Sequence, residues 1–164
     1  MEQDLARRTE ERTLASAGQT PHRYTLPEPY RELDHTADVG VEVEGRSLAE
    51  VVARLVLAEA ALLAGGGAVL PDREELLEVK GEDLTRTALA LLRELLYRFA
   101  TARVIAASCT VHAAGSTGLA VLVELGPYDP VAHAEGHDLK AVTWHEARCA
   151  EEGDLWRARV IFDL

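Results

Sequence analysis

The stretch ELDHTADVG, residues 32–40, gathers several reactive side chains just before an alternating apolar run. Asp34, His35 and Asp38 lie within five positions of one another, next to the valines of VGVEVEG. Carboxylates and imidazoles are side chains that bind metal ions or transfer protons. The stretch predicts either a polar turn or one part of a metal or catalytic site whose other part lies elsewhere in the chain.

A second group of oxygen ligands stands at the C-terminal end. In LWRARVIFDL the side chains alternate as in a strand, and Asp163 falls on the more polar face. Asp38 likewise has the parity opposite to the valines that follow it. If the two strands are neighbours, Asp38 and Asp163 converge away from the core, and the terminal carboxylate of Leu164 adds another hard oxygen. Such ligands suit Ca²⁺, Mg²⁺ or Mn²⁺ rather than zinc, although two solvated acids at strand ends would give the same pattern.

The segment HDLKAVTWHEA places Lys140 and His145 on a predicted strand over residues 138–148. A lysine near clustered acids neutralises them or binds an anion, and the alternative is a solvated lysine with a packed histidine. The nearby pair His133 and His137 has H-x₃-H spacing, but its loop contains proline and glycine, so a preformed zinc site is not expected. No nucleophile elbow and no H-E-x-x-H motif occurs, and no catalytic residue is predicted.

The charge balance limits the classes of partner. Formal net charge is −11, and the 132 residues after Glu32 hold 22 acids against 12 Lys and Arg. An acidic body without a basic stripe is a poor direct binder of nucleic acid, and it is better suited to a metal ion or a basic protein partner. Cys109 and Cys149 lie 40 positions apart, which favours two reduced, inert thiols and a cytoplasmic protein. No apolar run of 18 residues is present, so no membrane span is predicted.

The helices and strands that must position these residues can be predicted from the periodicity of apolar residues and from capping residues, glycine and proline. Residues 1–29, charged and then proline-containing, are expected to form a flexible N-terminal extension, with one compact domain over 30–164. A helix should begin at the capping box of Ser47 and Glu50 and end at Gly65, so the triple glycine is a helix exit rather than a phosphate loop. A second helix is predicted over 82–101, and strands over 39–44, 74–81, 103–112, 118–125, 138–148 and 155–162. The expected fold is α+β, with two main helices packed on a mixed or antiparallel sheet of about six strands.

Four motifs together resemble one known family. HTADVGVEVEG, ELLY, LKAVTWH and VIFDL occur in the order found in the archease family, and the resemblance covers residues 30–164. Archeases are similar in being small acidic α+β proteins with one metal site, acting as accessory factors of the RtcB-type RNA ligase. That ligase joins 2′,3′-cyclic-phosphate or 3′-phosphate RNA ends to 5′-hydroxyl ends with GTP and Mn²⁺. The resemblance implies a non-catalytic activator that promotes ligase guanylylation and multiple turnover in tRNA splicing or RNA repair.

The resemblance also implies which residues form the site. Metal ligands would be Asp38, Asp163 and an oxygen of Leu164, with Ca²⁺ expected and Mn²⁺ or Mg²⁺ as alternatives. The residues expected beside the metal are Lys140, His35, Asp34 and His145.

Two other functions fit the same residues. One is a metal-dependent phosphoesterase or nucleotidase built on Asp38, Asp163 and His35, which would turn over without a partner. The other is a chaperone-like or structural metal-binding protein without a role in RNA ligation.

Overall fold

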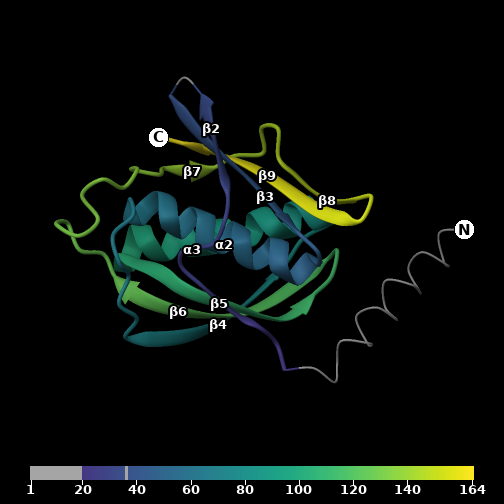
Figure 1. Ribbon diagram of the computed structural model, residues 1–164, viewed down its shortest axis with the longest axis horizontal. Helices are drawn as coiled ribbons and strands as arrows, with labels where there is room; N and C mark the ends of the chain where they lie inside the picture. The colour runs from purple at the N-terminus through teal and green to yellow at the C-terminus, as the bar shows by residue number, and fades with distance from the viewer. Residues whose placement is uncertain (1–19, 36) are drawn as a thin grey trace, which may run out of the picture.

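The computed structural model describes residues 20–35 and 37–164. Two helices lie between two antiparallel β-sheets, which Figure 1 shows below and above them. In chain order the elements are β1 (Arg23–Thr25), β2 (Arg31–His35), β3 (Asp38–Gly45), α2 (Leu48–Ala64), β4 (Arg73–Lys80), α3 (Leu84–Ala102), β5 (Val104–Ala114), β6 (Gly118–Pro127), β7 (Ala141–Val142), β8 (Arg148–Glu152) and β9 (Leu155–Asp163).

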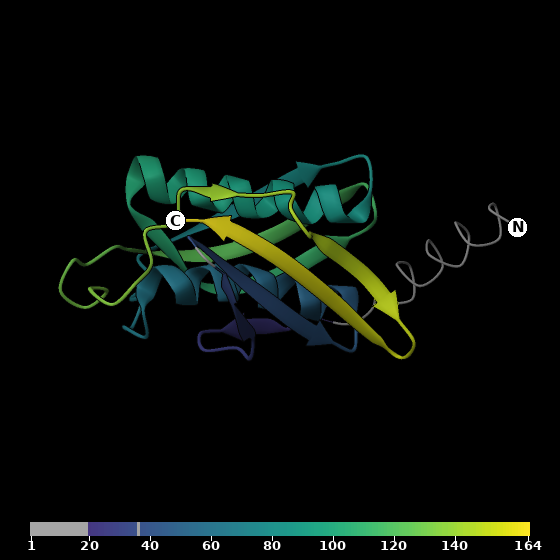
Figure 2. The ribbon, with the colours of Figure 1, turned by 90° about the horizontal axis from the view of Figure 1, so that it is seen from above.

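The first sheet has the strand order β1-β5-β6-β4, and the second has the order β2-β3-β9-β7 with β8 also paired to β9. Seen from above, β3 and β9 of the second sheet cross diagonally over the helices (Figure 2). The α+β prediction with two main helices is confirmed. The described residues form nine strands in two sheets rather than about six in one, because β1, β2 and β7 are too short to produce an alternating pattern.

Helix α2 begins and ends where its sequence predicts. The Ser47 side chain accepts a hydrogen bond from the Glu50 N–H at 3.1 Å, and Gly65 closes the helix in the left-handed conformation with φ 58°. The apolar stripe of α2 predicts one buried face, but the helix is buried on nearly all sides because it contacts both sheets. Glu59 is buried with it, at 2 % exposure.

Regular structure in the described part of the chain begins before residue 30. Residues 23–25, predicted to belong to a flexible extension, form β1 and pair antiparallel with β5. The Leu26 N–H donates to the Ala107 carbonyl at 3.2 Å, and Tyr24 packs against the core. The prolines around this segment keep the strand to three residues, which is too short to show an alternating pattern in the sequence. Residues 1–19 lie outside the described part.

The strand predicted over 138–148 is also corrected. Only Ala141–Val142 is strand, and a turn at residues 145–146 separates it from β8. Glu146 adopts a φ of 52° in this turn, which an unbroken strand would not allow.

Candidate functional site

The HTAD, KAVT and terminal motifs meet at one edge of the second sheet, where β3 begins and β9 ends. In the ladder of β2, β3 and β9, His35 lies opposite Asp38, and Asp38 lies opposite Asp163. On its other side Asp163 pairs with Ala141 of β7. The sequence left open whether these two strands are neighbours. The structure pairs β3 with β9, and segments more than 100 residues apart in sequence meet in one row.

Asp38 and Asp163 form a pair of like charges. Directly opposed residues of an antiparallel pair point to the same face with Cβ atoms about 4.5–5.5 Å apart, where two carboxylates repel each other. Asp38 is half-buried and Asp163 is exposed. A cation between the two carboxylates would reduce this repulsion, and oxygen ligands select hard cations.

Lys140 lies at the same edge. Its N–H donates to the carbonyl oxygen of Asp163 at 2.9 Å, which joins the segment preceding β7 to the end of β9. Thr143 continues the contact, with its N–H and Oγ1 donating to the Ile161 carbonyl at 3.0 Å and 2.9 Å. The backbone thereby fixes the KAVT segment beside the acid pair.

Arg93 of α3 supports β7 from the other side, a role that the sequence pattern did not indicate. Its Nε and Nη2 atoms both lie 3.3 Å from the Val142 carbonyl oxygen. In the sequence, Arg93 is only a cation beside the apolar face of the predicted second helix. Cations at such positions are common on surface helices.

Asp34 and His35 belong to β2, with their backbones opposite Val39 and Asp38. Their side chains and residue Thr36 lie outside the described part, so their place near the metal stays a prediction. Ala37, in the turn between β2 and β3, has a φ of 67°, a left-handed conformation uncommon for a residue with a Cβ.

His145 lies in the exposed turn after β7, beyond the residues that pair with β9. Its Nε2 atom is 4.0 Å from Glu146 Oε2, and 69 % of its side chain is exposed. Its predicted role beside the metal stays a prediction.

The two loop histidines have structural contacts. The Nδ1 atom of His133 accepts from the Asp129 N–H at 2.9 Å, and its Nε2 atom lies 2.8 Å from the Ala68 carbonyl oxygen. Both ring nitrogens of this buried side chain are thus occupied. His137 Nε2 lies 3.4 Å from Glu32 Oε1. In the described part of the chain no group of three or more His, Cys, Asp or Glu side chains is arranged to hold a metal ion.

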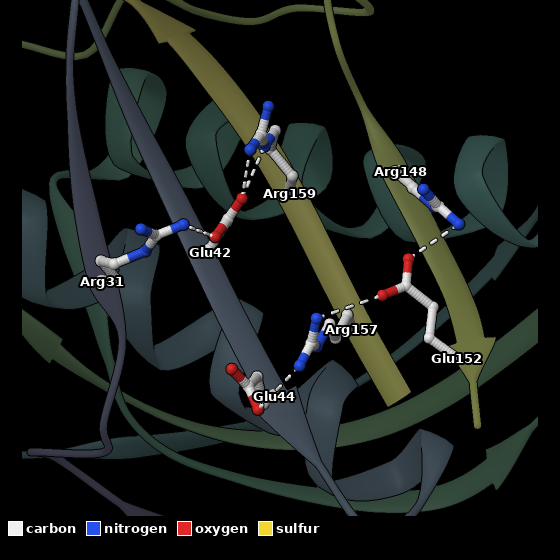
Figure 3. A network of polar contacts seen from close by, with 7 residues as sticks. All are labelled: Arg31, Glu42, Glu44, Arg148, Glu152, Arg157 and Arg159. Atoms are coloured by element: carbon white, nitrogen blue, oxygen red, sulfur yellow. Dashed lines mark hydrogen bonds and ion pairs between the residues drawn. The ribbon is translucent and has the colours of Figure 1, made fainter. Parts of the chain in front are cut away.

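A groove of about 640 Å³ crosses the outer face of the second sheet. Figure 3 shows its charged side chains: Glu42 bridges Arg31 and Arg159, and Glu152 joins Arg157 and Arg148. The hydrogen bonds from Arg31 and then from Arg159 hold the pKa of Glu42 below its usual value. Each arginine already has a glutamate partner, so the groove is a cross-strand ion-pair network rather than an open anion site.

Known proteins are similar to this chain over the region that contains these residues. Residues 30–164 match the archease protein family (MTH1598/TM1083). The chain is 30% identical over 135 residues to protein archease of Archaeoglobus fulgidus, covering 82% of this chain and 98% of that protein. It is 27% identical over 139 residues to protein archease of Methanopyrus kandleri, covering 83% and 99%.

Two solved structures share the fold. The solution structure of Methanobacterium thermoautotrophicum protein 1598 superposes with a TM-score of 0.61 at 24% identity, covering 82% of this chain and 98% of that one. The crystal structure of an archease from Thermotoga maritima, described as a possible chaperone, gives a TM-score of 0.54 at 18% identity, covering 86% and 99%. No helix among the described residues is long and apolar enough to cross a membrane. The family match runs from Tyr30 to Leu164 and includes the whole row of HTAD, KAVT and terminal residues, and this chain therefore belongs to the archease family.

Proposed function

We propose that this chain is a non-catalytic accessory protein that activates an RtcB-type, GTP-dependent RNA ligase. Its action would be to promote guanylylation of the ligase and multiple turnover, in tRNA splicing or RNA repair. The observation that supports this proposal is the meeting of three distant motifs at one sheet edge, with Asp38 opposite Asp163 and Lys140 bonded to Asp163.

In this proposal a divalent ion is held by Asp38, Asp163 and an oxygen of Leu164. All three donors are oxygens, which fits Ca²⁺ first and Mn²⁺ or Mg²⁺ as alternatives. When bound, the ion would supply positive charge near a transferring phosphoryl group. The two carboxylates hold it at the exposed end of the sheet, where a partner can reach it, and Lys140 adds a cation to the same edge.

The acidity of the chain supports an accessory role. With a net charge of −11, the protein is not expected to bind RNA tightly by itself, and it can approach a basic ligase surface without competing for the RNA. The expected site of action is therefore the ligase and not free RNA.

RNA joining under multiple-turnover conditions tests the proposal. An RtcB-type ligase from the same organism, GTP and Mn²⁺ are combined with the wild-type chain, Asp38→Ala, Asp163→Ala or the control Asp154→Ala. Asp154 is an exposed acid in the turn at the opposite end of β9. We expect strong stimulation by the wild type and the control, and loss of most stimulation in the two site variants.

Two results would count against the proposal. Full stimulation by folded Asp38→Ala would remove the acid pair from the mechanism. If the wild type fails to stimulate an active ligase while metal chelation still lowers its thermal stability, the chaperone-like alternative is favoured. The description of the Thermotoga maritima relative as a possible chaperone is the observation behind that alternative.

A further inference from the structure

Strand β7 is bordered by two large aromatic side chains that remain exposed. Trp144, two residues after β7, is 50 % exposed, and Tyr97 of α3 is 65 % exposed. The guanidinium of Arg86 lies 4.5 Å from the centroid of the Trp144 ring. Tryptophan, tyrosine and arginine are the residues that most often carry the binding energy of protein interfaces.

These side chains lie on α3 and just after β7, the strand that borders the acid pair. Arg86, Arg93 and Tyr97 are seven and four residues apart and share one face of α3. Arg93 donates to the Val142 carbonyl, so this helix face lies along β7, as Figure 2 also shows. The opposite edge of β7 pairs with Asp163. We call Arg86, Arg93, Tyr97 and Trp144 the α3–β7 strip, and only β7 separates it from the proposed metal site.

The two arginines of the strip differ in their partners: Arg86 forms an ion pair with Asp83, whereas Arg93 pairs with no described carboxylate. The Arg93 guanidinium contacts a carbonyl oxygen, and within the described residues it forms no ion pair. Lys140, exposed at the start of β7, likewise forms no ion pair with a described side chain. The arginines of the outer groove, in contrast, all have glutamate partners. Arg93 of the strip and the neighbouring Lys140 are thus the cations that carboxylates of a partner could pair with.

A protein fits this surface better than RNA does. A phosphate backbone longer than the strip would meet the surrounding surface of a chain with a net charge of −11, which repels it. A folded partner can present a few carboxylates locally, around an apolar centre that covers Trp144.

We propose that the α3–β7 strip is the docking surface for the ligase of the proposed function, through a ligase segment that carries carboxylates around an apolar centre. This inference rests on the proposed function and adds to it the partner-binding residues. Trp144 is the central anchor, Arg86 supports its ring, and Arg93 pairs with a carboxylate of the ligase. Docking here sets Asp38 and Asp163 at the margin of the interface.

The test separates docking from activation. Stimulation of RNA joining is titrated with wild type, Trp144→Ala, Trp144→Phe and Arg93→Glu, and ligase binding is measured directly in parallel. Controls are Lys80→Glu, an exposed cation on β4 with the same charge change, and Leu70→Ala, an exposed apolar side chain that is 75 % accessible. Thermal unfolding of each variant shows whether it is folded, and Arg93→Lys keeps the charge if Arg93→Glu disturbs β7.

We expect Trp144→Ala to raise the half-maximal concentration for stimulation about tenfold or more, as for an interface hot spot. The plateau at saturation should stay at the wild-type level, with Trp144→Phe partly restoring the affinity. Asp38→Ala should instead lower the plateau. Higher salt should weaken wild-type binding more than that of Arg93→Glu.

Other outcomes would overturn the inference. If the wild type stimulates the ligase, and folded Trp144→Ala and Arg93→Glu do so with the same half-maximal concentration, the strip is not the docking surface. The proposed function then still stands. A wild type that neither binds nor stimulates the ligase overturns both. If the protein alone binds a single-stranded RNA oligonucleotide and loses this in Trp144→Ala with ligase affinity unchanged, the strip is an RNA surface.

Discussion

Glu59 is a carboxyl group without a polar environment. Its Oε2 atom has no hydrogen-bond partner among the described residues, and burial raises its pKa well above the usual value. It borders a cavity of about 10 Å³, roughly one water molecule in size, lined otherwise by aliphatic side chains: Val56, Ala60 and Leu63 of α2, Leu95 of α3, Val104, Ile105 and Ala106 of β5, and Leu125 of β6. Because none of these groups carries a charge that could stabilise a carboxylate, burial favours the protonated form of Glu59.

The raised pKa of Glu59 predicts a loss of stability toward alkaline pH. The folded state retains a proton that the unfolded chain releases, so stability is full below the unfolded pKa and falls as pH rises toward the folded pKa. The expected slope is about 1.4 kcal/mol per pH unit in that window. Urea unfolding between pH 5 and roughly 8 should show this slope in wild type and a flatter curve in Glu59→Gln, with Glu59→Leu more stable at neutral pH. Parallel curves for all three would contradict the prediction.

The two thiols are predicted to be unreactive in the native state. Burial raises the pKa of Cys109 and of Cys149 to about 12, so almost no thiolate forms at pH 8. Both are free and buried. An aromatic disulfide reagent should therefore react slowly with the folded protein and rapidly with two thiols per chain in urea. A fast reaction without denaturant would show that the core around them opens.

At the scale of elements, the second sheet is held on its outer face by opposed charges. Glu42 of β3 lies directly opposite Arg31 of β2 and Arg159 of β9, and Glu152 of β8 forms an ion pair with Arg157 of β9. The Nε atom of Arg159 donates to Glu42 Oε2 at 2.8 Å. These ion pairs connect β2, β3, β9 and β8 across the outer face of the sheet, as Figure 3 shows.

Removal of the Glu42 charge should weaken this sheet by a modest amount. We expect Glu42→Gln to lower the free energy of unfolding by roughly 0.5–1 kcal/mol at low salt, since Arg31 is exposed and Arg159 is partly exposed. The effect should shrink in about 1 M NaCl. The stabilising effect of Glu42 should also shrink at low pH, where its carboxylate becomes protonated. Because its pKa is depressed, this loss should begin below the pH range in which an ordinary glutamate titrates. Glu78→Gln, an exposed acid on β4, is the matched control, and an equal loss in both variants would exclude a specific network effect.

At the scale of the whole molecule, the acid pair exists only because the start of β3 meets the end of β9. The start of β3, the segment before β7 and the end of β9 come together above the helices, and the C-terminus lies beside β7 (Figure 1). An ion bound at this edge would connect three parts of the chain and would bind the folded state only.

Calcium is therefore expected to stabilise the fold. At a free concentration about 100 times the dissociation constant, binding adds about 2.7 kcal/mol, or an increase in Tm of about 5–10 °C for a domain of this size. Differential scanning calorimetry with Ca²⁺ and with a chelator measures the shift. Asp163→Asn should abolish it, and Asp154→Asn should leave it intact. A shift that persists in Asp163→Asn would place the ion elsewhere.

Much of the local structure could be predicted from particular residues. Ser47 and Gly65 mark the ends of α2 because their contacts lie within one turn of the helix. The alternation of β3 and β9 put Asp38 and Asp163 at strand ends on the polar face. Predictions failed where no local pattern exists, as in the three-residue β1 and the two-residue β7.

The triple glycine shows the difference between local and tertiary causes. The sequence predicts a helix exit at Gly65, which the structure confirms. Only the fold reveals that a Cβ on Gly67 would lie 2.0 Å from the Ala132 carbonyl oxygen, and one on Gly136 2.0 Å from that of Leu63. The glycines permit close backbone packing between the helix exit and the loop of residues 132–136, a contact between segments about 70 residues apart.

The sequence by itself determined the α+β class, the two helices and the parity of the two acids, because capping and periodicity act over a few residues. Tertiary structure alone decided that β3 and β9 are neighbours, that Asp38 faces Asp163, and that α2 lies buried between two sheets with Glu59 inside it. Strand pairing and burial depend on contacts between distant segments, and their free energy is a property of the assembled layers rather than of any local stretch.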